Sequence, residues 1–427
     1  MSKKIGLKEA ISIGIGGMVG GGIFAVLGLA VSLGKGGTPV SFLIAGFIAL
    51  LTCYSYSKLS ISFPDSGGTV KFINEGFGKG IFSGGTNNLL WMSYIIMLSL
   101  YSAAFGSYAP NLLALTTSKN LDQHIYSSAI IILATAVNYY SIKVVGKIES
   151  YAVVIKLVIL IGFVFVGAYG LFGNENIGQL NTENWESPFK LITAGMVIFV
   201  AYEGFELIAN AAPDIENPEK NIPRAYFFSV IFVIILYILI AIITVGSLPF
   251  SEIAKAKDYV LAEASKPLLG TIGFTVITIA ALLSTFSAIN ATLYGGSRVS
   301  YEIAEDEELP HELSAKLWNQ PVGLIITAIA TLIITNTLNL ESISTAGSVG
   351  FLLIFAIVNF VGFKLANQLN ANKIIPFMGF ILSSVAMVVL TVQQIGDNPI
   401  GITISWGIIF VCFILEWLYK KTEVFKS

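Results

Sequence analysis

The sequence predicts an all-α integral membrane protein of about twelve transmembrane helices, in which the first and the sixth helix are broken. Three observations lead to this prediction: few charged residues, long apolar runs at regular intervals, and glycines or carboxylates within two of these runs. Of 427 residues, 55% are hydrophobic and only 12% are charged. A soluble domain carries about 25% charged residues, so this chain has too few to cover an exterior that faces water. A lipid bilayer is therefore the expected solvent for most of its surface.

Apolar runs long enough to cross a bilayer occur about twelve times between polar breaks. A hydrocarbon core about 30 Å thick requires roughly 20 apolar residues in a helix. Runs of this length begin near Leu7, Thr38, Gly80, Tyr126, Ile148, Leu191, Ala225, Leu268, Val322, Glu341, Ile374 and Ile400. No soluble domain fits between any two of them, and we expect Ser251–Ala264 to form a short amphipathic helix at an interface. The first run is too long and too rich in glycine for a signal peptide, which predicts an uncleaved anchor.

Lysine and arginine are distributed unevenly over the segments that join these runs. An even number of spans places both termini on one side of the membrane. If that side is the cytoplasm, seventeen of the 24 lysines and arginines fall on inner segments and six on outer segments. The positive-inside rule then predicts a multi-pass protein of the cytoplasmic membrane with both termini in the cytoplasm.

Several classes of function are not expected from the composition. A net charge of −2 provides no basic stripe for nucleic acid. Cys53 and Cys412 lie in apolar runs, and His124 and His311 are the two histidines, so neither a disulfide framework nor a zinc site is expected. An enzyme would require a nucleophile and base, or a metal cluster, at one membrane level, and none is visible. We therefore expect no catalytic residue, cofactor or metal, and no oligomeric state is predicted.

The first and sixth spans contain residues that interrupt a transmembrane helix. Six glycines occur between Gly14 and Gly22, each unfavourable by roughly 1 kcal/mol relative to alanine in a helix. In the sixth span, Gly204 lies between Glu203 and Glu206. Non-helical backbone at this depth is tolerated only where it lines a cavity or is buried in protein. Breaks five spans apart match two five-helix repeats of inverted topology, expected at residues 7–173 and 191–366 and followed by two helices at 374–419.

The backbone groups freed by two such breaks suit a solute that carries one positive and one negative charge. Amides at the N-terminus of a half-helix attract a carboxylate, whereas carbonyls at a C-terminus accept hydrogen bonds from an ammonium group or coordinate a cation. The alternative is close helix packing through glycines. The matching break at Gly204 favours the first interpretation, a transporter of zwitterions.

Four motifs support a resemblance to a known family. They are GMVGGGIF at Gly17–Phe24, PDSGG at Pro64–Gly68, AYEGFE at Ala201–Glu206 and ENPEKNIPRA at Glu216–Ala225. In their order and spacing they resemble the amino acid–polyamine–organocation (APC) superfamily, from about Leu7 to Tyr419. The chain looks most like the prokaryotic, broad-specificity, proton-coupled amino-acid permeases of the ApcT type. The resemblance implies a LeuT-like fold with twelve helices and amino acid/proton symport.

The resemblance also implies a substrate site and a coupling site. The substrate carboxylate would bind the amides of Gly21 and Gly22, and its ammonium group would meet the carbonyls of Met18, Val200 and Glu203. The substrate site as a whole comprises Met18, Gly20, Gly21, Gly22, Val200, Glu203 and Gly204. The place of a sodium ion in sodium-coupled relatives corresponds here to Gly16, Val19, Lys156, Ser284 and Ser287.

Lys156 is an ionisable residue inside an apolar span, which is by default a hypothesis of function. Burial disfavours the charged form of an amine, which would allow this lysine to release and rebind a proton. In proton-coupled relatives the lysine at this position is proposed to do so. The alternative is a side chain that extends back to the cytoplasmic interface, since Lys156 lies about 12 Å along its helix from Ile148.

Other polar residues of the spans have two possible roles each. Glu203 and Glu206 could be hydrated beside the break, or Glu206 could be a gate, as in related exchangers. Asn290 could contact the substrate or form a hydrogen bond between helices, and we expect the hydrogen bond. The aromatic residues of the third span, Trp91, Tyr94 and Tyr101, could line the pocket or simply pack.

Three functions therefore remain open at this stage. The first is a proton-coupled symporter of amino acids, with neutral substrates favoured by a pocket with few charges, a preference that Glu203 could reverse. The second is an uncoupled exchanger, or antiporter, in which Lys156 is structural. The third is a nutrient sensor without transport, or a channel, although no span carries the recurring polar residues that a channel requires.

Overall fold

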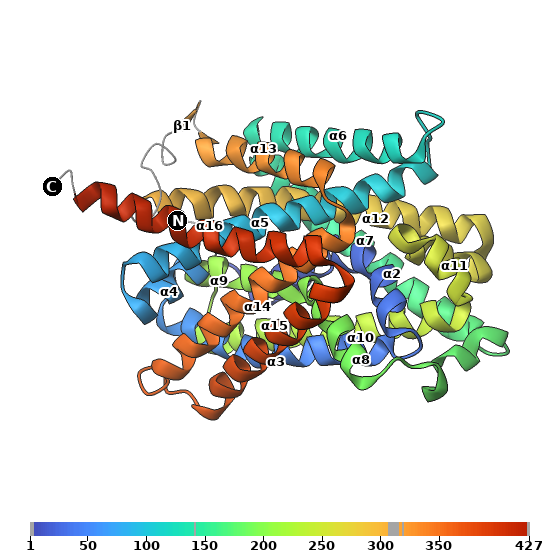
Figure 1. Ribbon diagram of the computed structural model, residues 1–427, viewed down its shortest axis with the longest axis horizontal. Helices are drawn as coiled ribbons and strands as arrows, with labels where there is room; N and C mark the ends of the chain where they lie inside the picture. Colours follow the sequence, from blue (N-terminus) through green and yellow to red (C-terminus); the bar gives the residue numbers. More distant parts are fainter. Residues whose placement is uncertain (1–3, 141, 306–315, 318–319, 425–427) are drawn as a thin grey trace.

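The computed structural model describes residues 4–140, 142–305, 316–317 and 320–424, and these residues are almost entirely helical (Figure 1). The α-helices are α1 (Leu7–Met18), α2 (Gly22–Gly34), α3 (Thr38–Ser62), α4 (Thr69–Phe77), α5 (Ile81–Tyr108), α6 (Lys119–Tyr140), α7 (Ile142–Gly170), α8 (Pro188–Val197), α9 (Leu207–Ala211), α10 (Pro218–Ser247), α11 (Phe250–Lys255), α12 (Val260–Glu305), α13 (Val322–Thr337), α14 (Leu340–Lys364), α15 (Ile374–Asp397) and α16 (Pro399–Val424). The 3₁₀-helices are η1 (Ala109–Asn111), η2 (Glu175–Leu180), η3 (Thr182–Asn184), η4 (Phe199–Glu206), η5 (Ala212–Asp214) and η6 (Lys257–Tyr259). Two short strands, β1 (Lys316–Leu317) and β2 (Gln320–Pro321), form an antiparallel pair before α13.

The helices confirm an all-α membrane protein with two broken spans. Within the described residues, eight helices are long and apolar enough to cross a membrane, and two bent pairs raise this number to ten. The first pair is α1 and α2, bent by 45°, and the second is α8 with the segment Phe199–Asp214, bent by 44°. The two remaining predicted spans coincide with α6 and with the shorter apolar helix α13.

The long helices pack in pairs that are distant in the sequence. Helix α3 packs against α10, α5 against α12, and α1 against η4. Figure 1 shows α6 and α13 side by side along one edge of the molecule, next to α5 and α12. Helices α15 and α16 pack on α14, and α16 also contacts α5. The two breaks are thereby enclosed by other helices.

Glycines let the two broken spans approach each other at backbone distance. A Cβ atom on Gly17 would lie 2.5 Å from the carbonyl oxygen of Gly204, and one on Gly204 would lie 2.5 Å from the amide nitrogen of Met18. One on Gly22 would lie 2.9 Å from the Cα atom of Ala201. None of these glycines has a positive φ, so close approach, rather than an unusual backbone angle, requires them here.

The segment between α10 and α12 differs from its prediction. The prediction of one amphipathic helix at Ser251–Ala264 is wrong, because the structure has α11, the turn η6 and the beginning of α12 in this segment. The chain turns at Ala256, where the amide of Tyr259 bonds back to the Ala256 carbonyl at 2.8 Å. The turn is held because the backbone of Lys257 rests directly on Gly28 of α2. Helix α12 is in turn interrupted at Gly270, whose φ of 60° and ψ of −147° suit glycine alone.

Gly204→Ala should destabilise the fold, because the new methyl group would overlap the backbone of Gly17 and Met18, which cannot rotate away. Overpacking of this kind costs about 1–3 kcal/mol, and we expect a lower midpoint of thermal unfolding of the purified protein in detergent. Gly407→Ala on α16 is the matched control, because a Cβ atom there meets nothing within 4 Å. Equal unfolding midpoints for the two variants would contradict the requirement for close approach.

Candidate substrate and coupling site at the broken helices

The seven residues expected to bind substrate gather around the contact between the two breaks. Gly20 and Gly21 lie between α1 and α2, Gly22 begins α2, and Met18 ends α1. Val200, Glu203 and Gly204 belong to η4, which packs against α1 and α2. All seven are buried, with Met18 and Val200 each 1% exposed. The two segments therefore form one buried cluster.

The first turn of α2 supplies amides that have no partner within the helix, as at every helix N-terminus. The helix begins at Gly22. The amide of Ala25 donates to the carbonyl oxygen of Gly21, the residue before the helix, at 2.9 Å. The ring of Tyr101 lies directly against Gly21. An anion that reached these amides would also meet the positive end of the helix dipole.

The carbonyls at the breaks accept hydrogen bonds from hydroxyl groups of neighbouring helices. The hydroxyl of Tyr237 on α10 donates to Met18 at 2.7 Å and lies 3.3 Å from the carbonyl oxygen of Ala201, so one side chain joins both broken spans. On α14, Ser344 and Ser348 donate to the carbonyl of Val197 at 2.8 and 2.9 Å. Neighbouring side chains thus satisfy the backbone groups that the breaks release.

Lys156 and Ser284 bind the break in the first span from two sides. The amine of Lys156, on α7, donates to the carbonyl oxygen of Gly16 at 3.0 Å, and its side chain is 0% exposed. The hydroxyl of Ser284, on α12, lies 2.9 Å from the carbonyl oxygen of Val19 and 2.7 Å from that of Gly20. The Lys156 side chain therefore does not extend to the surface. Ser287 is buried on α12 and makes no hydrogen bond among the described residues.

Both carboxylates of the sixth span are buried and bonded to hydroxyl groups. Glu203 accepts a hydrogen bond from Tyr101 at 3.1 Å and is 4% exposed. Glu206 is 1% exposed and accepts from Thr69 at 3.2 Å and from Tyr56 at 3.4 Å. Their environment is thus a layer of hydroxyl groups from α3, α4 and α5, with little surface open to water.

The remaining polar residues singled out in the sequence make contacts between helices. Asn138 of α6 donates to the side-chain oxygen of Asn290 at 2.9 Å, which confirms Asn290 as a contact between helices. Trp91 donates to Thr327 of α13 at 3.0 Å, away from the breaks. Of the aromatic residues of α5, Tyr101 lies against Gly21, and Tyr94 interacts with the side chain of Glu206.

The described part of the chain holds no group of three or more potential metal ligands. Cys53 and Cys412 are buried free thiols. The ring of His124 bonds to the side chain of Asn336 at 2.9 Å, and His311 lies outside the described residues.

Sequence reasoning missed Tyr237, Ser344 and Ser348. These residues lie in apolar spans, where a tyrosine or a serine is unremarkable on its own.

Comparisons with known proteins identify the family. The sequence matches the family model of amino acid permeases over residues 5–417. The chain belongs to the amino acid permease family. It is 35% identical over 425 residues to an uncharacterized protein of Methanocaldococcus jannaschii, with 98% of this chain and 96% of that protein covered. It is 32% identical over 388 residues to the inner membrane transport protein YbaT of Escherichia coli, covering 91% and 89% of the two chains.

A further relative is the branched-chain amino acid permease BcaP of Bacillus subtilis, 25% identical over 339 residues, with 74% of this chain and 70% of that protein covered. The protein is thus a multi-pass permease of the cell membrane that transports amino acids, and not an enzyme.

Ser284→Ala should destabilise the permease, because the carbonyls of Val19 and Gly20 lose their shared donor while they stay buried. A buried acceptor left without a partner costs about 1–3 kcal/mol, which thermal unfolding in detergent would detect. Ser287→Ala, on the same helix, removes a buried hydroxyl that bonds to neither carbonyl and should have a smaller effect. If the two variants unfold at the same temperature, the hydroxyl of Ser284 does not hold the break.

Proposed function

We propose that this permease is an amino acid/proton symporter in which Lys156 is the proton-responsive group. The observation that supports the proposal is the hydrogen bond from the buried amine of Lys156 to the carbonyl of Gly16, in the last turn of α1. The C-terminal end of a helix carries partial negative charge, and a cation beside it is stabilised. A protonated lysine therefore supplies at this point the charge that a bound sodium ion would supply.

Release of the proton would change how α1 packs. The neutral amine has no charge to interact with the end of α1, so the attraction between α7 and α1 weakens. Ser284 holds the other side of the same break. Protonation would thus favour the packed arrangement of α1, and deprotonation would favour its movement, which couples the proton to a change of state.

The substrate site in this proposal uses both breaks. The carboxylate of the amino acid binds the amides of Gly21 and Gly22, and the ammonium group binds the carbonyls of Met18, Val200 and Glu203. A carbonyl oxygen has two lone pairs, so Met18 can accept from Tyr237 and from the substrate. Tyr101 lies against Gly21, and its movement would open the amides to the carboxylate.

Glu203 and Glu206 have separate roles in this scheme. Glu203 accepts a hydrogen bond from Tyr101, and it would lose this bond when the ring of Tyr101 moves away. Glu206 joins α3 and α4 to η4 through Tyr56 and Thr69, as expected of a gate. We propose neutral rather than cationic substrates, in line with the branched-chain specificity named for BcaP.

We also propose the arrangement of the chain in the membrane. The two five-helix repeats comprise residues 7–173 and 191–366, followed by two helices at 374–419. Contacts between corresponding spans support this division, since α3 packs on α10 and α5 on α12. The excess of lysine and arginine on one set of segments supports cytoplasmic termini.

Lys156→Ala should abolish accumulation driven by a pH gradient while it leaves the substrate site intact. Purified protein in proteoliposomes would be assayed for uptake of radiolabelled alanine with an acidic exterior, and for counterflow without a gradient. We expect uptake to fall to the level seen without a gradient. Lys364→Ala is the matched control, because Lys364 also donates to a backbone carbonyl, that of Gly76 at 2.7 Å, but lies away from the breaks.

The three hypotheses from the sequence give different results in this assay. Accumulation by Lys156→Ala equal to that of the unmodified protein would rule out the role of Lys156 in coupling. Exchange that never responds to a gradient would indicate an antiporter. Absence of any flux would indicate a sensor.

The orientation can be tested with reporters fused after residue 427. With a cytoplasmic C-terminus, a fluorescent protein should be bright and alkaline phosphatase inactive, because the latter requires an oxidising compartment for its disulfides. Active phosphatase with a dark fluorescent protein would reverse the proposed orientation.

A further inference from the structure

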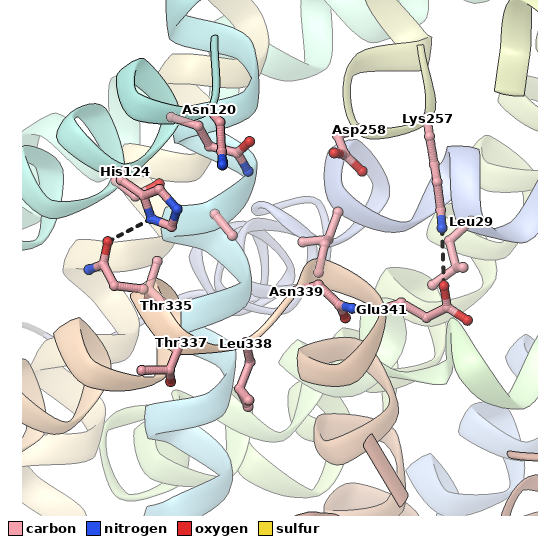
Figure 2. A pocket seen from close by; sticks show the side chains of 15 residues that line it. Leu29, Asn120, His124, Lys257, Asp258, Thr335, Thr337, Leu338, Asn339 and Glu341 are labelled. Carbon is pink, nitrogen blue, oxygen red and sulfur yellow. Dashed lines mark hydrogen bonds and ion pairs between the residues drawn. The ribbon is translucent and has the colours of Figure 1, made fainter. Parts of the chain in front are cut away.

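A polar cavity of about 430 Å³ lies at the end of the molecule formed by η6, the start of α6 and the turn from α13 to α14. Figure 2 shows Asn120 and His124 on one side of it and Asp258, Lys257 and Glu341 on the other. A second cavity of about 290 Å³ adjoins it and shares Lys257 and Asp258 as lining residues. The transport scheme above uses neither cavity.

Charges of both signs face this cavity from adjacent positions of η6. Lys257 pairs with Glu341 of α14 at 3.0 Å, which uses one of the three donors of its ammonium group. Asp258 makes no hydrogen bond or ion pair within the part of the chain that the structure describes.

Other charged groups nearby have partners of their own, and the charge of Lys119 also acts on the Asp258 carboxylate. Lys119 lies over the ring of Tyr259, 3.9 Å from its centroid, and Lys255 pairs with Glu252 at 2.8 Å. The His124 ring bonds to Asn336. The cavity therefore offers the carboxylate of Asp258 and, across from it, the ion pair of Lys257 with Glu341, among neutral amide side chains.

We propose that this cavity is a docking site for a zwitterionic amino acid, separate from the site between the broken helices. The carboxylate of the ligand would bind the ammonium group of Lys257, and its own ammonium group would bind the carboxylate of Asp258. Pockets for small ligands measure about 300–1,000 Å³, and this cavity falls within that range. The proposal rests on the transport function and the orientation given above, which place the cavity on the outer side.

The position of the cavity connects it to the broken helices. Leu29 of α2 and Ala103 of α5 belong to its lining. Ala103 is two residues from Tyr101, the ring that covers Gly21. The backbone of Lys257 rests on Gly28 of α2, whose first turn holds the proposed substrate amides. A ligand held by η6 is thus separated from those amides by α2 and the Tyr101 side chain.

The experiment measures protection of a reporter cysteine by amino acid. Thr337 is exposed and lines the cavity, and both native cysteines are buried. Thr337→Cys protein in proteoliposomes would be labelled from outside with a charged, impermeant methanethiosulfonate, with and without alanine. At alanine concentrations ten times the half-saturating value, occupancy should slow labelling roughly tenfold. Counterflow of alanine would be measured in the same vesicles.

Asp258→Asn in the same background should remove the protection while counterflow at saturating alanine persists, and Lys257→Gln should act in the same way. Glu252→Gln is the matched control, because it neutralises a nearby carboxylate outside the cavity and should retain protection. Protection that persists in Asp258→Asn would overturn the proposal, since closure over the central site would then explain it. Counterflow without protection in the Thr337→Cys parent would overturn the docking site alone, whereas absence of both would also overturn the transport function.

Discussion

The contact between Gly17 and Gly204 is the constraint on which the rest of the structure depends. At this point two spans, almost two hundred residues apart, meet backbone to backbone. The glycines bring the ends of the half-helices together, so that amides and carbonyls from both spans lie close to one another. A side chain at either position would push the breaks apart, and the donors and acceptors would no longer converge.

The broken backbone is stable because surrounding helices each contribute a donor to it. Lys156 from α7, Tyr237 from α10, Ser284 from α12 and the serines of α14 all bond to carbonyls released by the breaks. A transmembrane helix normally satisfies its own backbone. Here side chains of the surrounding helices donate hydrogen bonds to carbonyls that a continuous helix would have bonded itself. The position of each of these helices is therefore coupled to the conformation of the breaks.

The sequence predicted the helices and the breaks because both depend on local composition. The length of an apolar run and a cluster of glycines can be read directly, and the structure confirmed an all-α membrane protein with two broken spans. The partners of the breaks could not be found in this way, because Tyr237, Ser344 and Ser348 are set apart only by their contacts. The wrong helix at Ser251–Ala264 has a similar cause. The turn at Ala256 depends on the close contact of Lys257 with Gly28, more than two hundred residues away.

The hydroxyl of Tyr237 has one proton and two acceptors within reach, the carbonyl oxygens of Met18 at 2.7 Å and of Ala201 at 3.3 Å. The shorter distance shows which of them receives the proton in this arrangement. If α1 withdrew from η4, the hydroxyl could rotate to Ala201 without passing through an unbonded state. The Tyr237 hydroxyl would then keep one hydrogen bond, whereas the carbonyl of Met18 would lose its donor. Tyr237 would thus act as a switch between two carbonyls, bonded to the first broken span in one arrangement and to the sixth in the other.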